Sequence, residues 1–233
     1  MMADLTLLQD IEARSADEVV EQVLAVHALR SVCLTCSFQA EDIIVLNLLR
    51  RRLPQIPVLF LETGYHFRET YEFRDRMTSE WNLNLINAAP RTTVAQQESE
   101  LGILYRDDPT RCCQLRKVEP LIRALEPFEI WFTGLRRDQS PTRRKLQKAE
   151  DHRLPSGKTL LKVSPLADWT WGQVWEYTSA NRLSFLPQYD YGYRSIGCEP
   201  CTSVPDDPAN PRSGRWGGKK LECGIHTFSE RTP

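Results

Sequence analysis

Four of the seven cysteines in this chain form two close pairs whose thiols could together bind a metal. Cys112 and Cys113 are adjacent, and Cys198 and Cys201 form a Cys-x-x-Cys turn. Four thiolates suffice for a zinc ion or for an iron–sulfur cluster. Adjacent cysteines point in different directions, which a bulky cubane cluster tolerates better than one tetrahedral zinc ion. The pattern therefore favours a cluster and leaves zinc as the alternative.

Cys223 stands alone in a basic, Gly-rich segment. Lys219, Lys220 and His226 lie close to it in sequence, and positive neighbours lower the pKa of a thiol and favour its reactive thiolate form. Gly224 gives the backbone freedom to bring the thiol into a site. Most lone cysteines are inert, so the residues alone leave a structural role open.

Cys33 and Cys36 also have Cys-x-x-Cys spacing, but they lie in an expected strand. Residues three apart in a strand face opposite sides of the sheet and cannot easily share a metal. We therefore expect two small buried hydrophobic side chains.

Three arginines are candidates for binding an anion. Arg143 follows an expected strand, and Arg212 and Arg215 lie in the C-terminal segment. Guanidinium forks match the oxygens of phosphate and sulfate. The basic run continues past Arg143 at Arg144 and Lys145, so some of these charges are expected to face only water.

The elements that must position these residues alternate between short apolar strands and helices. A capping box at Ser15 and Glu18 begins the first helix. The expected strands are Val32–Cys36, Val58–Leu61, Leu83–Ile86, Ile130–Thr133 and Lys158–Val163. This alternation predicts an α/β fold with an open parallel sheet and helices on both faces. We expect residues 1–186 to form this nucleotide-binding domain and residues 187–233 to form a loop-rich, cluster-binding and catalytic tail.

Two expected turns lie where ligands of parallel sheets bind, beyond the carboxyl ends of the strands. Ser37 and Asp42 belong to the turn after the first strand, and Thr63 and Gly64 to the turn after the second. The helix after the first turn offers free N–H groups to an anion. Read alone, this segment is equally consistent with a plain strand-to-helix turn.

Composition excludes some broad classes of protein. The net charge is -1 over 233 residues, so no global basic field argues for nucleic acid or for an anionic membrane. No apolar run approaches the length of a membrane span, and the N-terminus lacks the pattern of a secretion signal. We therefore expect a cytoplasmic protein whose thiols stay reduced. A homo-oligomer is a separate expectation, which these features do not establish.

Several of these segments together resemble one family. The segments 195–202, 212–216 and 222–226, with Cys112-Cys113, 134–140 and 165–169, are similar to the assimilatory adenylyl-sulfate (APS) reductases, close relatives of the 3'-phospho-APS (PAPS) reductases. Matching segments run in the same order from Ser37 to His226. The resemblance implies an adenine-nucleotide alpha-hydrolase-like fold with a modified phosphate loop. This chain departs from the usual loop, because it carries Gln39 and Ala40 where relatives usually have Ser or Gly.

The resemblance also implies a reaction and a set of roles. It implies thiol-dependent reduction of APS to sulfite and AMP, in which Cys223 carries an S-sulfonate and thioredoxin supplies the second thiol. It implies a [4Fe-4S] cluster on Cys112, Cys113, Cys198 and Cys201. Catalytic candidates are Cys223, His226 and Lys117, and substrate-binding candidates are Ser37, Asp42, Thr63, Gly64, Arg143, Arg212 and Arg215.

Three rival functions stay open at this point. The first is PAPS reduction by the same residues. The second is a non-catalytic iron–sulfur redox sensor, against which segment 212–215 argues, because a sensor needs no anion site. The third is sulfurtransfer or adenylation, which would leave the C-terminal segment unexplained.

Overall fold

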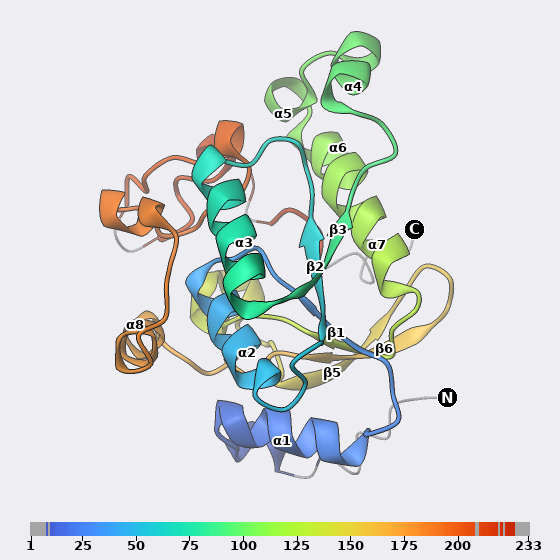
Figure 1. Ribbon diagram of the computed structural model, residues 1–233. Coiled ribbons are helices and arrows are strands. Elements are labelled where there is room, and N and C mark those ends of the chain that lie inside the picture. Colours follow the sequence, from blue (N-terminus) through green and yellow to red (C-terminus); the bar gives the residue numbers. More distant parts are fainter. Residues whose placement is uncertain (1–7, 9, 208–209, 219, 221, 227–233) are drawn as a thin grey trace.

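A six-stranded sheet forms the centre of the molecule, with helices on both faces (Figure 1). The computed structural model describes residues 8, 10–207, 210–218, 220 and 222–226. The strand order is β3-β2-β1-β4-β6-β5, and the first five strands in this order are parallel. The strands are β1 (Val32–Thr35), β2 (Pro57–Leu61), β3 (Asn84–Ala88), β4 (Ile130–Phe132), β5 (Ala149–Arg153) and β6 (Thr159–Val163). The expected fold class is confirmed.

One strand of the sheet was not anticipated. β5 pairs antiparallel with β6 at the edge, so the sheet is mixed rather than purely parallel. Its sequence Ala-Glu-Asp-His-Arg has no apolar alternation, and only Ala149 and His152 are buried. An edge strand with one wet face needs little apolar content, which is why the pattern did not reveal it.

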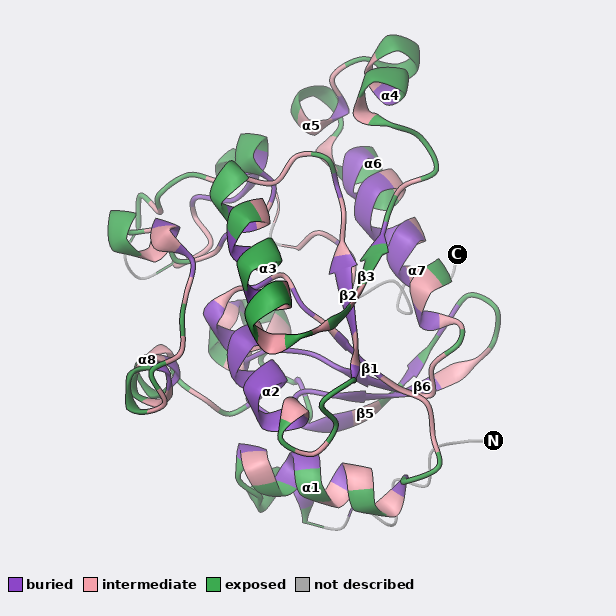
Figure 2. Ribbon diagram, viewed as in Figure 1, coloured by how far each residue is buried: buried purple, intermediate pink, exposed green. Residues whose placement is uncertain are grey.

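The helices divide between the two faces of the sheet. The helices are α1 (Ala16–Val26), α2 (Ala40–Arg50), α3 (Arg68–Trp81), α4 (Val94–Leu101), α5 (Leu104–Asp107), α6 (Pro109–Cys113), α7 (Glu119–Leu125) and α8 (Trp171–Ala180). Side chains of α1, α2, α3 and α8 share the larger core with Leu34 and Phe132. Those of α7 pack with Trp131 on the other face. Figure 2 shows the contrast between the buried α2 and the more exposed α3 and α4.

Local sequence signals account for several boundaries. The capping box at Ser15 and Glu18 is present, and Thr170 and Gln173 form a second one at the start of α8. Cys33 and Cys36 are both buried and belong to the cores on opposite faces, as expected for small hydrophobic side chains in a strand.

The chain after α8 runs through short turns, and some of its side chains join the main core. Leu186 and Ile196 are buried among the α1 and α2 residues. Isolated bridges join His66 to Cys198 and Thr202 to Arg215. The division between residues 1–186 and 187–233 remains a proposal, with the tail packed onto the domain through these contacts.

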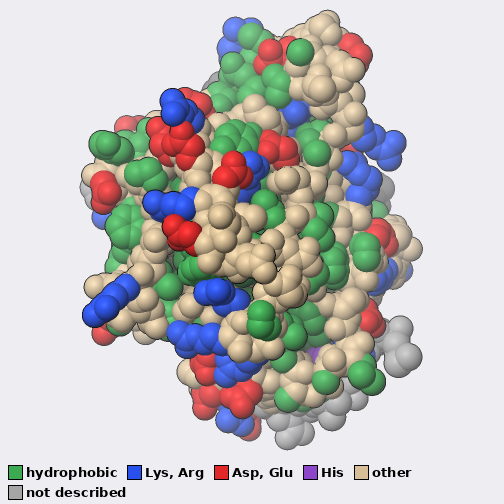
Figure 3. All heavy atoms as spheres, viewed as in Figure 1, with side chains coloured by type: hydrophobic (Ala, Val, Ile, Leu, Met, Phe, Trp, Pro, Cys, Tyr) green, Lys and Arg blue, Asp and Glu red, His purple; other side chains and the backbone are tan. Residues whose placement is uncertain are grey.

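Charges of both signs are interspersed over the face seen in Figure 3. Among the described residues, no helix combines the length and the apolar composition that a membrane crossing requires.

Candidate active site and cysteine cluster

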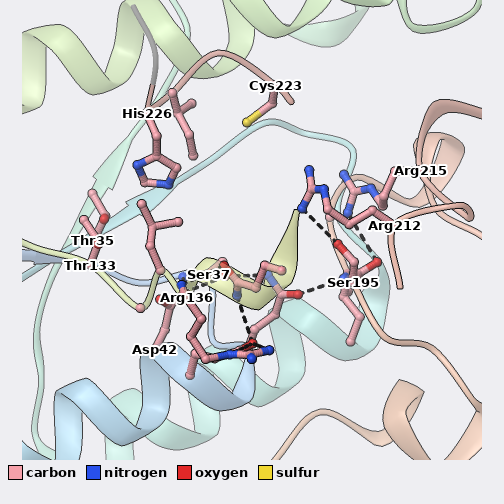
Figure 4. A pocket seen from close by; sticks show the side chains of 18 of the residues that line it. Thr35, Ser37, Asp42, Thr133, Arg136, Ser195, Arg212, Arg215, Cys223 and His226 are labelled. Carbon is pink, nitrogen blue, oxygen red and sulfur yellow. Dashed lines mark hydrogen bonds and ion pairs between the residues drawn. The ribbon is translucent and has the colours of Figure 1, made fainter. Parts of the chain in front are cut away.

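A pocket of about 370 Å³ lies at the carboxyl ends of the central strands. Its wall combines the turns after β1 and β4 with three parts of the tail, around residues 194–197, 211–216 and 223–226. In Figure 4, Cys223 and His226 lie along one side and Ser37, Asp42 and Arg136 along the other. This is the sheet edge at which parallel α/β proteins bind ligands.

The turn after β1 is held by a half-buried carboxylate. Asp42 Oδ2 accepts hydrogen bonds from the backbone N and the Oγ of Ser37, both at 2.6 Å. Burial raises the pKa of Asp42 to about 6, although the hydrogen bonds from Ser37 oppose the shift. Gly134 packs against this carboxylate so closely that a Cβ there would overlap Asp42 Oδ1.

Gln39, the departure from the usual loop, connects the turn to the tail. Its Nε2 donates to Ser37 Oγ at 3.0 Å, and its Oε1 accepts from the backbone N of Ile196 at 2.8 Å. The next residue, Ala40, donates its backbone N–H to Tyr189 Oη at 3.2 Å. Two tail residues therefore fix the start of α2.

Thr63 and Gly64 lie near the paired cysteines and do not line the pocket. The Thr63 side chain is fully buried, and Cys198 Sγ donates to Thr63 Oγ1 at 3.3 Å. Gly64 has a φ of 73°, and a Cβ there would lie 2.6 Å from Val94 Cγ2. The turn after β2 thus supports the cysteine region, which the carboxyl-edge argument did not distinguish from the pocket.

Three candidate arginines do line the pocket together. Arg143 approaches it from the turns after β4, and Arg212 and Arg215 approach it from the tail. Arg212 Nη1 donates to Ser195 Oγ at 3.3 Å, and Arg215 Nη1 to the Ser195 carbonyl at 3.4 Å (Figure 4). Burial, with the charge of Arg143 nearby, lowers the pKa of Arg212 to about 10, which leaves it charged at neutral pH.

Glu222 is a site residue that sequence reasoning missed. Arg143 holds its carboxylate with two bonds, Nε to Oε1 at 2.9 Å and Nη2 to Oε2 at 2.8 Å. Arg212 Nη2 lies 3.6 Å from the same Oε2. Burial alone would raise the pKa of Glu222, but the Arg143 hydrogen bonds outweigh it and the pKa is lowered. Its place beside Cys223 in sequence was the available signal.

Sequence reasoning also missed a buried ion pair on the side of the pocket opposite Cys223 (Figure 4). Arg136 Nη2 bonds Glu41 Oε1 at 2.9 Å, and both side chains are at most 6% exposed. Gln139 Nε2 donates to the same oxygen at 2.9 Å. Removing either partner of this buried ion pair would leave an uncompensated charge. The pair should therefore stay intact and hold this part of the pocket wall in place.

Cys223 lies at the junction of the pocket and the cysteines. It lines the pocket and packs against the group formed by Cys113, Cys198, Cys201 and Trp216. Lys117, Arg212 and Arg215 interact electrostatically with it. Lys219, also expected near Cys223, lies outside the described residues.

His226 has a packing partner that the sequence did not indicate. Its ring stacks on Trp131 of β4, with centroids 5.5 Å apart and an interplanar angle of 15°. Burial lowers its pKa well below the ordinary value, and the charge of Lys162 adds to the effect. The imidazole is therefore neutral near pH 7, and the positive charge expected from it beside Cys223 comes from Lys117, Arg212 and Arg215 instead.

The four paired cysteines meet around one small cavity, as Cys112, Cys113, Cys198 and Cys201 all line it. Each is buried. Burial raises the pKa of Cys112 to about 12 and of Cys201 to about 11, with neighbouring sulfurs adding to both shifts. Four buried thiols that line one cavity form a donor set suited to an iron–sulfur cluster or to a zinc ion.

Lys117 lies between the two cavities and lines both. It belongs to a π-helical turn, Gln114–Val118, that begins directly after Cys113. Burial disfavours its ammonium charge, yet its pKa is raised because the sulfurs of Cys198, Cys113 and Cys223 stabilise that charge. A cation that lines both cavities can act on both sites.

Comparison with known families identifies the chain. A model of the phosphoadenosine phosphosulfate reductase domain matches residues 31–204. The chain belongs to this family. That match includes the turn at Ser37 and Asp42, Arg143 and both cysteine pairs, and the expected relationship is confirmed.

Relatives within the family carry two related names. An adenosine 5'-phosphosulfate reductase from Bacillus subtilis (strain 168) is 43% identical over 82% of this chain and 82% of its own length. A phosphoadenosine 5'-phosphosulfate reductase from Gloeobacter violaceus is 40% identical over 97% of this chain and 96% of its own length.

Solved structures of this family and of more distant proteins share the fold. The phosphoadenylyl-sulfate (PAPS) reductase from Candida auris, in a phosphate complex, has a TM-score of 0.72 at 22% identity, covering 87% of this chain and 98% of that one. The U34-tRNA thiolase from Methanococcus maripaludis, with its [4Fe-4S] cluster, has a TM-score of 0.51 at 15% identity, covering 73% and 64%.

Proposed function

We propose that the protein reduces APS to sulfite and AMP through an S-sulfonate on Cys223, with thioredoxin as the reductant. The observation that carries this proposal is that Cys223 shares one pocket with Arg143, Arg212, Arg215 and the turn at Ser37. A reactive thiol beside an anion site at the nucleotide-binding edge suits attack on a nucleotide-linked sulfonyl group. We place this reaction in the cytoplasm, in assimilatory sulfate reduction for cysteine biosynthesis.

The first half-reaction needs only the substrate. The Cys223 thiolate attacks the sulfur of APS, an S–S bond forms, and the bond from sulfur to the phosphate oxygen breaks. The electron pair of that bond leaves with AMP. Arg212 and Arg215 are suited to neutralise the charge that develops on the departing phosphate.

The second half-reaction needs an external dithiol. One thiolate of thioredoxin attacks Cys223 Sγ, and sulfite leaves with the electron pair of the S–S bond. The second thiol of the donor then resolves the mixed disulfide and restores the Cys223 thiol. The donor is oxidised by two electrons, which balances the reduction of sulfate sulfur to sulfite.

A [4Fe-4S] cluster fits the four buried thiols, and Cys112, Cys113, Cys198 and Cys201 would hold it. Such a group supplies fixed charge and local folding energy when bound. Lys117, which reaches both cavities, is suited to carry positive charge from this region toward the substrate.

PAPS is the alternative substrate, because the Gloeobacter relative bears the name of a PAPS reductase at nearly the same identity.

Incubation with APS in the absence of thioredoxin tests the proposal. We expect one equivalent of AMP and one sulfonate on Cys223, measured by mass spectrometry, with less product from PAPS. Cys223→Ser should abolish the adduct, and Cys33→Ser should not. An adduct on another cysteine, or sulfite formation by Cys223→Ser, would contradict the assignment.

A further inference from the structure

The anion-binding arginines already hold an anion that belongs to the protein itself. Both guanidinium groups of Arg143 and Arg212 face the carboxylate of Glu222, at 2.8 Å and 3.6 Å. Thr142 Oγ1 donates to the same carboxylate at 2.9 Å. We call Arg143 and Arg212 the arginine pair.

This contact is largely removed from water. The side chains of Arg143 and Arg212 are 12% exposed, and that of Glu222 is 13% exposed. A substrate anion that binds the arginine pair must therefore take donors from Glu222. The displaced carboxylate cannot stay buried without its partners, because an unpaired buried charge is costly.

The backbone around Glu222 ties this exchange to Cys223. Glu222 directly precedes Cys223, and Gly224 follows at a φ of 96°, a conformation that favours glycine. Beyond it, Ile225 packs against the α7 side of the sheet and His226 stacks on Trp131. The segment is held at His226 on one side and at the Glu222 carboxylate on the other, with Cys223 between the two contacts.

We propose that Glu222 is an internal substitute for the substrate's anionic group, which substrate binding displaces, and that the displacement frees Cys223. This inference rests on the proposed function, in which Cys223 must meet first the substrate and then an external thiol. The phosphosulfate group of the substrate carries two negative charges and several acceptor oxygens, more than one carboxylate offers to guanidinium forks, so exchange favours the substrate. Competition lowers the apparent affinity by the fraction of molecules whose arginine pair is free.

The affinity of a Glu222 variant for AMP distinguishes a displaceable Glu222 from one that only positions the arginine pair. In Glu222→Gln the competing charge is gone, so AMP and inorganic sulfate should bind tighter by about threefold or more, measured by calorimetry. Glu176→Gln, an exposed residue of α8, removes the same charge elsewhere and should leave both affinities unchanged. Unchanged or weaker binding of AMP to Glu222→Gln would mean that Glu222 only positions the arginines, and would overturn the proposal.

Alkylation of Cys223 tests the coupling. Without any ligand, iodoacetamide should modify Cys223 several times faster in Glu222→Gln than in the wild-type chain or in Glu176→Gln. Peptide mass spectrometry measures this at Cys223 alone. If AMP binds tighter but Cys223 is alkylated at the wild-type rate, the coupling is wrong.

The binding measurement uses AMP and sulfate, the labelling measurement uses iodoacetamide, and neither requires catalytic turnover. A protein that makes no sulfite from APS, yet shows both effects, would refute the proposed function and keep this inference. Normal sulfite formation without either effect would support the proposed function and refute this inference.

Discussion

At the scale of single residues, the pocket depends on charges that are buried and paired. Arg212 is the clearest case, since its guanidinium reaches Ser195 and Glu222 while its side chain is 12% exposed. A charged hydrogen bond in such surroundings contributes more than one at the surface.

Replacing Arg212 by Ala should therefore weaken APS binding or slow sulfonate formation by about tenfold or more, from the loss of about 1.5 to 3 kcal/mol for a charged hydrogen bond. Single-turnover kinetics with APS measure both quantities. Arg144, an exposed neighbour of Arg143, provides the control, and Arg144→Ala should have a much smaller effect. Equal effects at the two positions would mean that Arg212 contributes only solvated charge.

Asp42 should make stability depend on pH. Its pKa is raised from 3.8 to about 6 by burial, so the folded state binds its proton more tightly than the unfolded state. Ionisation therefore costs stability as pH rises above about 4, and the cost is complete above about 6, reaching about 3 kcal/mol.

Asp42→Asn lacks this ionisation. Its free energy of unfolding relative to the wild type should rise with pH between about 4 and 6 and then level off. Urea titrations at several pH values measure the difference. A constant difference across that range would show that Asp42 has an ordinary pKa in the folded protein.

At the scale of elements, a few short segments deliver most of the site. The π-helical turn Gln114–Val118 carries Lys117 from the cysteine cavity to the pocket, and the 3-10 turn Glu199–Cys201 brings the second cysteine pair to the first. Neither turn has a core of its own. Their shape depends on contacts around the cysteines, so a bound cluster would stabilise them.

Cys198→Ser should consequently lose the cluster and loosen the tail. We expect loss of the cluster absorbance and faster proteolysis after residue 198, while the far-UV circular dichroism of the α/β domain persists. Cys36→Ser, in the core of the sheet, is the contrast, since it should retain the cluster. A Cys198→Ser protein with normal iron content would show that this thiol is not a ligand.

At the scale of the whole molecule, the sequence predicted the fold well. Apolar runs located five strands, most of them buried at their centres. It did not reveal β5, whose residues are polar. It also placed Thr63 and Gly64 along the pocket, since strand order alone cannot tell which side of a turn faces a ligand.

The sequence indicated cysteines and arginines that the structure brings to the pocket and to the small cavity, but it did not indicate their partners. Cysteines and arginines can be recognised as candidates from their residue types. Glu222, Glu41 and Trp131 act through contacts between segments far apart in sequence. Such contacts follow from tertiary packing, which spacing does not encode.

The iron content of the whole protein tests whether the four paired cysteines bind a cluster. Protein purified anaerobically from iron-replete cells should be brown and contain about four iron and four sulfide per chain, because the four thiols line one cavity. Chemical iron and sulfide assays measure this. Stoichiometric zinc without iron would contradict it.

The hydrogen bond from Ile196 to Gln39 has a consequence for exchanging parts between homologous enzymes. On the tail side the donor is a backbone N–H, so the hydrogen bond does not depend on the side chain at position 196, except that proline would remove the donor. On the domain side the acceptor is one particular side chain. A foreign tail grafted from residue 187 onward should therefore keep these two contacts only when the recipient has Gln39 and the donor has a tyrosine at position 189.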